Sequence, residues 1–160
     1  MQFKGIHEKT LVIIKPDAIQ RGLVGDILNR FEKKGLKLVA LKMIRLDEAL
    51  LKEHYAHHVD KPFFPGISKF MQSSPVDAMC LEGLEVISAV RLITGITKSR
   101  EAEAGSIRGD FAMSIACNVI HASDTVENAK AEVGRFFSDK EIHDYMKSEY
   151  EFVYAQDELS

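Results

Sequence analysis

Apolar, strand-like runs alternate with amphipathic, helix-like segments along this 160-residue chain. Four runs are rich in β-branched and other apolar residues and stop at turn-forming residues, which is typical of strands. They lie within residues 9–17, 36–46, 76–83 and 111–123. In the first run, Pro16 has no N–H to give to a strand ladder, so Lys15 should lie at the end of the strand. Strands that alternate with helices predict a sheet covered by helices.

The segments between these runs carry apolar residues at helical spacing. Residues 24–35 and 84–95 show this pattern most clearly, and Gly35 and Gly95 end the two segments. Residues 62–74 predict a short helix after a proline-bounded turn. Four short strands with such helices suit a ferredoxin-like βαββαβ arrangement. We therefore expect an α/β (α+β) sandwich with a four-stranded antiparallel sheet.

Two acidic residues stand where further helices should begin. Asp47 can N-cap a helix that carries Leu50, Leu51 and His54. Asp124 can N-cap a later helix, with Glu127 at its third position as a variant of the capping box. The buried face of that later helix should consist of four apolar residues: Val126, Ala129, Val133 and Phe137.

Length and composition predict one domain over residues 1–160, because 46% hydrophobic residues can form one substantial core but the chain is short for two. Apolar runs such as residues 11–14 are far shorter than the roughly 20 residues that cross a bilayer. Residues 1–8 lack the apolar centre of a signal peptide. We expect a cytoplasmic protein without a membrane partner.

Cysteine content and charge narrow the classes of function further. Cys80 and Cys117 stand among apolar neighbours, where a thiol behaves as a small hydrophobe, so we predict neither a disulfide framework nor a thiolate metal site. The net charge of −3, without runs of lysine or arginine, argues against a nucleic-acid partner. A small anionic ligand needs only a local cluster of cations.

One of the six histidines, His121, follows a strand-like segment and precedes a predicted helix. A lone histidine is more often structural than reactive, but strand ends in α/β sheets commonly carry catalytic groups. Glu132 lies on the next helix, where periodicity alone favours a solvated charge. If Glu132 instead faces the imidazole, it fixes the tautomer and leaves the other ring nitrogen free to attack.

Residues 96–110 show no periodicity, and long ordered connections are often functional. Lys98, Arg100 and Arg108 lie in this connection and Arg91 precedes it, and arginine forks match phosphate oxygens. Such charges are commonly only surface charges. The chain has neither a G-x-x-x-x-G-K-[ST] nor a G-x-G-x-x-G motif, so side chains would have to bind phosphates. No spacing indicates a metal site, so Mg²⁺ would arrive on the phosphates.

The stretch NVIHASD (residues 118–124) resembles the active-site signature of nucleoside diphosphate kinases, N-x-x-H-[GA]-S-D. Five further stretches resemble the same family in the same order, over about residues 9–137: TLVIIKPDAIQRGLVGDI, HYAHHVDKPFF, SSPVDAM, RLITGIT and GSIRGDF. The resemblance implies a ferredoxin-like fold and a ping-pong transfer of the γ-phosphoryl group from a nucleoside triphosphate to a nucleoside diphosphate.

The resemblance also implies roles for individual residues. His121 would be the nucleophile and carry phosphate on Nδ1, with Glu132 to orient it and Ser123 to support both. Tyr55 would approach the reacting phosphate. Lys15 and Asn118 would contact the sugar 3′-hydroxyl and nearby phosphate oxygens. Other implied contacts are to the phosphates, the base and the walls of the nucleotide slot: Arg91, Thr97, Arg108 and His58; Phe63; Ile67 and Ile115.

The chain departs from the family pattern at three places. The connection before IRGDF usually contains prolines in the family, but TKSREAEAGS has none, which predicts a more mobile or differently packed loop. Ala116 and Cys117 stand where Gly-Arg is common, and the tail after Phe137 is only loosely family-like. Hexamers of the family use the connection before IRGDF in trimer contacts. Both a hexamer and a tetramer built from dimers therefore remain open for this homo-oligomer.

Two other functions remain open at this point. The first is a catalytically silent nucleotide-binding member of the family whose task is assembly with a partner, although every expected catalytic residue is present. The second is nucleic-acid binding, which the negative net charge disfavours.

Overall fold

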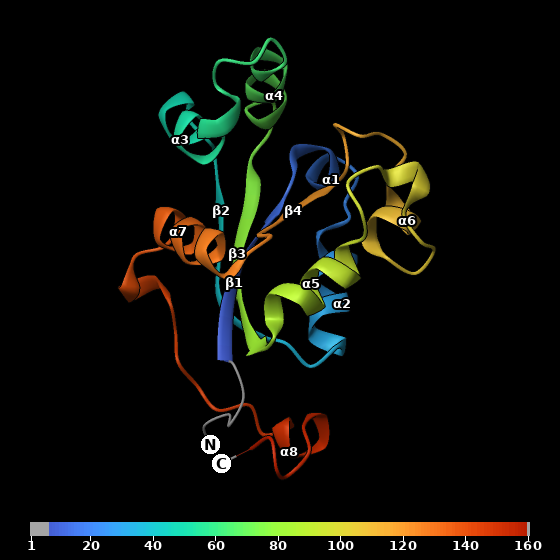
Figure 1. Ribbon diagram of the computed structural model, residues 1–160, viewed down its shortest axis with the longest axis vertical. Coiled ribbons are helices and arrows are strands. Elements are labelled where there is room, and N and C mark those ends of the chain that lie inside the picture. The colour runs from blue at the N-terminus through green and yellow to red at the C-terminus, as the bar shows by residue number, and fades with distance from the viewer. Residues whose placement is uncertain (1–6, 160) are drawn as a thin grey trace.

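A four-stranded antiparallel sheet forms the centre of the computed structural model, which describes residues 7–159 (Figure 1). Its strands are β1 (His7–Ile14), β2 (Lys37–Ile44), β3 (Val76–Leu84) and β4 (Ile120–Ala122). They lie in the order β2-β3-β1-β4, so the first and third strands of the chain are the two central ones. This is the ferredoxin-like arrangement expected from the sequence, and the fold prediction is confirmed.

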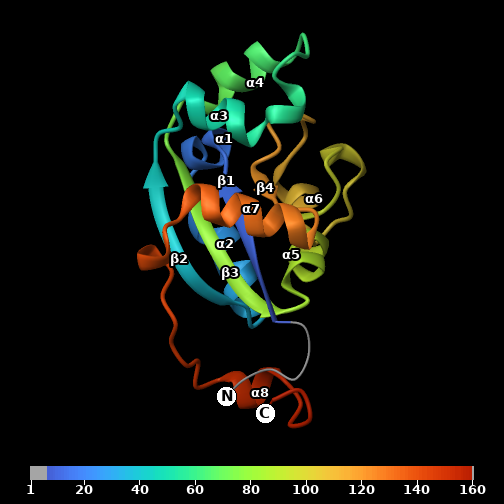
Figure 2. The same cartoon turned by 60° about the vertical axis from the view of Figure 1, so that its left-hand side comes forward.

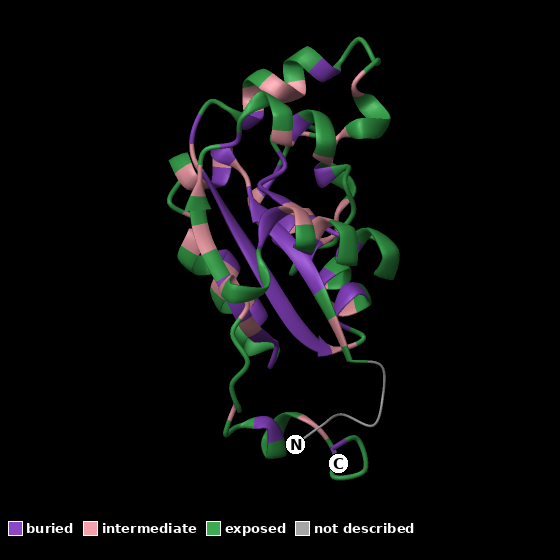
Figure 3. Cartoon of the chain, turned by 90° about the vertical axis from the view of Figure 1, so that its left-hand side faces the viewer, coloured by how far each residue is buried: buried purple, intermediate pink, exposed green. Residues whose placement is uncertain are grey.

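Both faces of the sheet are covered, as the buried central strands show (Figure 3). In β1, Val12 and Ile14 point into one cluster of buried residues, whereas Leu11 and Ile13 point into the other. All four are fully buried. A strand with two buried faces reads as a continuous apolar run rather than an alternating one, which explains the sequence of β1.

Helices supply the two covering layers (Figure 2). One cluster of buried residues takes side chains from α1 (Pro16–Gln20), α2 (Val24–Lys33), α5 (Val86–Thr94) and α6 (Ile107–Phe111). The other takes side chains from α3 (Glu48–His54), α4 (Phe64–Met71) and α7 (Val126–Phe136), although Ala129 of α7 belongs to the first cluster. No helix among residues 7–159 is long and apolar enough to cross a membrane.

The start of α7 differs from the prediction. Its N-cap is Thr125, whose hydroxyl accepts a hydrogen bond from the Asn128 backbone N–H at 3.1 Å, and not Asp124. Asp124 instead accepts a hydrogen bond from the Asn128 side chain, because aspartate and threonine are both good caps and only one can occupy the position. Val126 is the first residue of the helix and is 53% exposed rather than buried. The buried residues of the helix are Ala129, Val133 and Phe136, and the buried Phe137 follows it.

The connection over residues 96–110 contains structure that periodicity did not reveal. A 3₁₀ turn, η2 (Ser99–Glu101), precedes α6, which Ser106 caps by accepting a hydrogen bond from the Gly109 N–H at 3.0 Å. Elements this short have no repeated apolar spacing to detect.

The predicted extended run over residues 111–123 was too long. Only Ile120–Ala122 forms a strand, and Met113 and Ile115 are exposed in the loop before it. Cys117 is exposed in the same loop, which corrects its assignment as a small buried hydrophobe, whereas Cys80 is buried as expected.

The C-terminal segment runs along the outer edge of β2. It contains η3 (Asp139–Glu141) and α8 (Tyr150–Val153), and α8 lies at the opposite end of the molecule from α3 and α4 (Figure 1). The His143 N–H donates to the Val39 carbonyl at 2.8 Å, and the Tyr145 hydroxyl donates to the Leu38 carbonyl at 2.7 Å. The segment therefore occupies hydrogen-bonding groups that the edge strand would otherwise expose.

Candidate active site

A left-handed backbone residue positions the candidate nucleophile. Val119 has a φ of 63°, which is unusual for a β-branched residue, and it stands two residues before His121. The Lys15 N–H donates to the Val119 carbonyl at 2.9 Å, and the Asp17 carboxylate accepts from the Val119 N–H at 3.1 Å. These bonds fix the entry into β4, where His121 pairs with Ile13 of β1. No motif or spacing around Asp17 indicates this task.

Glu132 faces His121 rather than solvent. Its Oε2 lies 3.0 Å from Nε2 of His121 and accepts a hydrogen bond of 2.5 Å from the buried Ser123 hydroxyl. Burial acts to raise the pKa of Glu132, but the hydrogen bonds from His121 and from the Ser123 hydroxyl outweigh burial and lower this pKa to about 2. An ionised carboxylate can only accept, so Nε2 of His121 is the donor and Nδ1 carries the lone pair of the neutral ring.

Three cations, Lys15, Arg108 and Arg91, lie near one another around the start of β4. Nζ of Lys15 donates to Oδ1 of Asn118 at 2.7 Å. Burial and then the charge of Arg108 lower the pKa of Lys15 to about 8. Burial and then the charge of Arg91 lower the pKa of Arg108 to about 10. Mutual repulsion of this kind means that an anion bound among these groups would be stabilised.

Arg108 is buried and is held in place by three backbone carbonyl groups. Its side chain is 7% exposed and donates to the backbone carbonyls of Asn118 at 3.3 Å, Gly95 at 2.9 Å and Ile120 at 2.7 Å. A guanidinium has five N–H donors, so two remain beyond these three bonds. Arg108 thus ties the end of α5 to the residues around β4.

The other residues predicted to contact the nucleotide make no direct hydrogen bond or ring contact with His121 among residues 7–159. This holds for Phe63, Ile67, Thr97 and Ile115. Phe63, Thr97 and Ile115 are exposed, as are Arg91 and His58, whereas Ile67 is half-buried. The rings of Phe63 and His58 lie 5.3 Å apart. An exposed aromatic ring leaves a face available, and these roles stay predictions.

The end of α3 places two rings at the site. Tyr55 is half-buried, and burial and then the negative charge of Glu132 raise the pKa of its hydroxyl to about 12. His54 was not predicted as a site residue, yet its ring centroid lies 4.7 Å from that of His121 at an interplanar angle of 77°. The sequence places His54 at the end of a helix, beside Leu50 and Leu51. This position could indicate a site residue, but it is equally typical of a residue that packs in the core.

Three potential metal ligands also meet here. His54, His121 and Glu132 each offer one ligand atom, and these atoms lie within 4.8 Å of one another. They come from α3, β4 and α7, so no local spacing could reveal them. Two nitrogen donors do not suit Mg²⁺, which prefers oxygen ligands.

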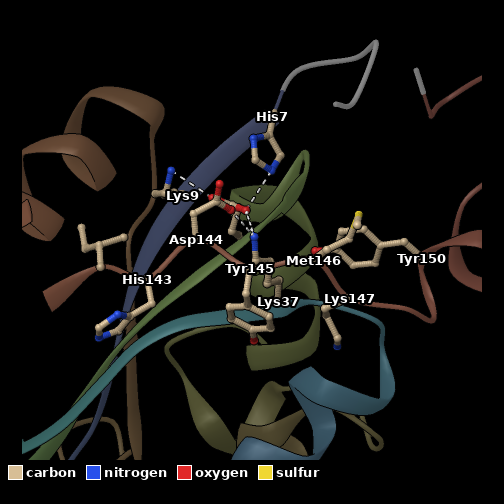
Figure 4. Close-up of a pocket in the computed structure, with 11 residues that line it drawn as sticks. His7, Lys9, Lys37, His143, Asp144, Tyr145, Met146, Lys147 and Tyr150 are labelled. Atoms are coloured by element: carbon tan, nitrogen blue, oxygen red, sulfur yellow. Dashed lines mark hydrogen bonds and ion pairs between the residues drawn. The ribbon is translucent and has the colours of Figure 1, made fainter. Parts of the chain in front are cut away.

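A cavity of about 660 Å³ lies elsewhere, between the beginning of β1 and the C-terminal segment (Figure 4). Glu82 lines this cavity and pairs with Lys9 at 2.9 Å, Lys37 at 3.1 Å and His7 at 3.3 Å. Lys37 also pairs with Asp144 of the C-terminal segment at 2.8 Å. None of the predicted site residues lines this cavity, so it is separate from the group around His121.

Comparison with known proteins places this site in a family. The family model described as nucleoside diphosphate kinase matches residues 8–142. The chain is 50% identical over 152 residues to a nucleoside diphosphate kinase of Parabacteroides distasonis, covering 95% of this chain and 99% of the relative. It is 48% identical over 147 residues to nucleoside diphosphate kinase B of Rattus norvegicus, covering 92% and 97%.

Solved structures give the same result. A halophilic nucleoside diphosphate kinase from Halobacterium salinarum, in complex with CDP, superposes with a TM-score of 0.90 at 44% identity and covers 93% of this chain and 99% of its own. A nucleoside diphosphate kinase family protein from Babesia bovis gives a TM-score of 0.89 at 40% identity, covering 92% and 99%. With family model, sequence and fold in agreement, the chain belongs to the nucleoside diphosphate kinase family.

Proposed function

We propose that this protein transfers the γ-phosphoryl group of a nucleoside triphosphate to a nucleoside diphosphate through a phosphohistidine on His121. The observation that carries the proposal is the contact of 3.0 Å between Nε2 of His121 and a carboxylate oxygen of Glu132, which leaves Nδ1 free as the nucleophile. Membership of the nucleoside diphosphate kinase family supports the reaction class.

The chemistry proceeds in two displacements at one atom. The Nδ1 lone pair attacks the γ-phosphorus, the bond from phosphorus to the β-phosphate oxygen breaks, and the diphosphate leaves with that electron pair. The proton stays on Nε2, where Glu132 stabilises the positive charge that the ring acquires. A β-phosphate oxygen of the acceptor diphosphate then attacks the phosphohistidine and regenerates the neutral ring.

Positive groups stabilise the transferred phosphoryl group. Phosphoryl transfer depends mostly on positioning and charge stabilisation, and Lys15, Arg108 and Arg91 provide the charges. The lowered pKa values of Lys15 and Arg108 support this role, since an arriving anion relieves their repulsion. Tyr55 would act close to the reacting phosphate. Mg²⁺ would come on the nucleotide phosphates, because the nearest cluster of potential ligands does not suit it.

Nucleotide binding would use the outer residues of the site. Phe63 would stack on the base, and one aromatic face accepts every base, so we propose broad base specificity. Ile67 and Ile115 would line the slot, Thr97 and His58 would contact phosphates, and Asn118 with Lys15 would contact the sugar hydroxyl. The complex of the Halobacterium relative with CDP supports a nucleotide as the ligand.

Assembly and compartment complete the proposal. We propose that residues 1–160 act as a single domain that assembles from dimers into a tetramer or hexamer, as family membership suggests. Two cysteines, both free, agree with a reducing compartment such as the cytoplasm.

The test is a phosphate-exchange assay between the triphosphate of one base and the diphosphate of another. The proposal predicts formation of the second triphosphate, with the parallel initial-rate plots of a ping-pong reaction. Binding of diphosphate without exchange would instead identify a catalytically silent member of the family. A requirement for both nucleotides to be bound together would contradict the covalent intermediate.

A further inference from the structure

Arg30 of α2 fastens residues 105–111, the segment that contains α6. Its Nη1 donates to the Gly105 carbonyl at 2.7 Å, and its Nη2 donates to Oδ2 of Asp110 at 2.5 Å. Its guanidinium carbon also lies 4.7 Å from the centre of the Phe111 ring. A planar guanidinium can make two hydrogen bonds and stack on a ring at the same time, which a lysine cannot. One side chain therefore contacts both ends of this segment.

The carboxylate of Asp110 also closes the segment on itself. Its Oδ1 accepts a hydrogen bond from the Gly105 N–H at 2.8 Å, while Oδ2 accepts from Arg30. Hydrogen bonds from the Gly105 N–H and then from Arg30 lower the pKa of Asp110, which keeps the carboxylate charged. Arg30, Gly105 and Asp110 thus form one closed set of hydrogen bonds.

The short helix α6 depends on such contacts for its position. It has five residues, and isolated helices shorter than about 12 residues are marginal in water. The connection over residues 96–110 contains no proline that would restrict its backbone. Ile107 is fully buried and anchors one side of α6, whereas the hydrogen bonds of Arg30 lie on the exposed side. Arg30 is therefore the contact that holds α6 from outside the core.

Arg108 lies within this fastened segment. It is the second residue of α6, and its side chain reaches the backbone carbonyls beside β4, among them that of Ile120 at 2.7 Å. These bonds leave two N–H donors of the guanidinium for phosphate oxygens. The direction of a side chain depends on the position of its backbone, so Arg30 can act on Arg108 through the backbone of α6 without touching the nucleotide.

We propose that Arg30 is a positioning residue for phosphate binding, which holds residues 105–111 so that the two remaining donors of Arg108 stay where phosphate oxygens arrive. This proposal rests on the proposed function, in which Arg108 contacts the phosphates. Without Arg30 the segment samples other positions, and a nucleotide binds only to the molecules in which the segment is in place. The apparent Kd then rises in inverse proportion to that fraction, whereas the chemistry in the bound complex keeps its rate.

Two substitutions test the guanidinium. Arg30→Met keeps an unbranched stem but loses both hydrogen bonds, and Arg30→Lys keeps the charge but can make only one of the two bonds. In calorimetric titrations with a nucleoside diphosphate, Kd should rise about 10-fold for Arg30→Met and by less for Arg30→Lys. Single-turnover phosphorylation at saturating nucleoside triphosphate should stay within about twofold of the wild-type rate. Lys33→Met, at an exposed position of the same helix, is the matched control and should change neither value.

Hydrogen exchange shows where the substitution acts. In Arg30→Met, the amides of Gly105 and Gly109 should exchange faster than in wild type, because the first bonds to Asp110 and the second to the Ser106 cap. A saturating nucleoside diphosphate should slow both amides again, since bound phosphate holds Arg108 and therefore α6 in place.

Three results would overturn the proposal. The first is an equal Kd in Arg30→Met and wild type, and the second is a lower maximal rate at an unchanged Kd. The third is faster exchange throughout the sheet rather than within residues 105–111, which would reduce Arg30 to a general role in stability. Failure of the proposed function is distinguishable, because wild-type protein would then form no phosphohistidine while its Kd for the diphosphate could still be compared with that of the variants.

Discussion

At the scale of single residues, the site depends on what surrounds the two nitrogens of His121. Nε2 is committed to Glu132, whose same oxygen also accepts from Ser123, so Nδ1 is the nitrogen left for chemistry. The geometry gives Glu132 two tasks, which are to hold the ring and to stabilise its charge once Nδ1 is phosphorylated.

Replacing this carboxylate with an amide separates those tasks. Glu132→Gln keeps the size of the side chain but loses the charge, so phosphorylation of His121 should slow by about 10²- to 10³-fold with little change in diphosphate affinity. Quenched-flow labelling measures the rate, and Glu127→Gln, at an exposed position in the first turn of α7, is the control. A fall in affinity at an unchanged rate of chemistry would contradict the role of Glu132.

Acid stability tests the same contact. The folded state lowers the pKa of Glu132 from 4.5 to about 2, so the folded state binds this proton less readily than the unfolded state. The stabilisation is therefore complete above pH 4.5 and is lost as pH falls towards 2. The difference in unfolding free energy between wild type and Glu132→Gln should shrink over this range in urea titrations. A difference that grows on acidification would contradict the assigned shift.

Site residues that belong to a recognisable motif could be predicted from the sequence. Residues that reach the site only through tertiary contacts could not. NVIHASD contains His121 and Ser123, and the helical spacing placed Glu132 near enough to be considered. His54 and Asp17 reach the site from α3 and α1, and their local sequences read equally well as ordinary helix residues. Their roles became visible only when tertiary contacts brought the segments together.

At the scale of elements, type and order were predictable but boundaries were not. All four strands were expected, and in the central strands β1 and β3 this is because two buried faces leave a long apolar run. The short elements η2 and α6 escaped prediction, since they depend on local hydrogen bonds such as the Ser106 cap. The start of α7 was misplaced because Asp124 and Thr125 have similar capping ability.

The cap of α7 gives a direct stability prediction. Thr125→Ala should lower the unfolding free energy by about 1 kcal/mol, because the Asn128 N–H loses its acceptor. Asp124→Ala should cost less, since that side chain accepts only from the exposed Asn128 side chain. Chemical denaturation compares the two variants. A larger loss for Asp124→Ala would show that the helix begins one residue earlier in solution.

At the scale of the whole molecule, an ion-pair cluster joins the C-terminal segment to the sheet. Lys37 is 4% exposed and lies between Glu82 and Asp144. Burial disfavours its charge, but hydrogen bonds to Asp144 and Glu82 outweigh burial and raise the pKa of Lys37. The segment that it holds runs along β2, far from the residues around His121.

Removing Lys37 should loosen this segment without changing catalysis. Lys37→Met should lower the unfolding free energy by about 2–3 kcal/mol. This loss is smaller than the largest losses measured for broken buried ion pairs, because Glu82 keeps its pair with Lys9. Limited proteolysis should then cut within residues 143–149, while the rate of phosphoryl exchange stays at the wild-type value. Asp144→Asn removes the same link to the segment and should also loosen it, but at a smaller loss of stability, because the Asp144 side chain is 98% exposed. Protection of the segment in Lys37→Met would show that other contacts hold it.

The most direct measurement is the location of the phosphoryl group on the protein. Wild-type protein is incubated with a nucleoside triphosphate without an acceptor, and the phosphorylated peptide is identified by mass spectrometry under alkaline conditions. We expect one acid-labile, base-stable phosphoryl group on His121, discharged by added nucleoside diphosphate and missing in His121→Gln. Labelling of a different residue, or phosphoryl exchange by His121→Gln at the wild-type rate, would contradict a phosphohistidine on His121.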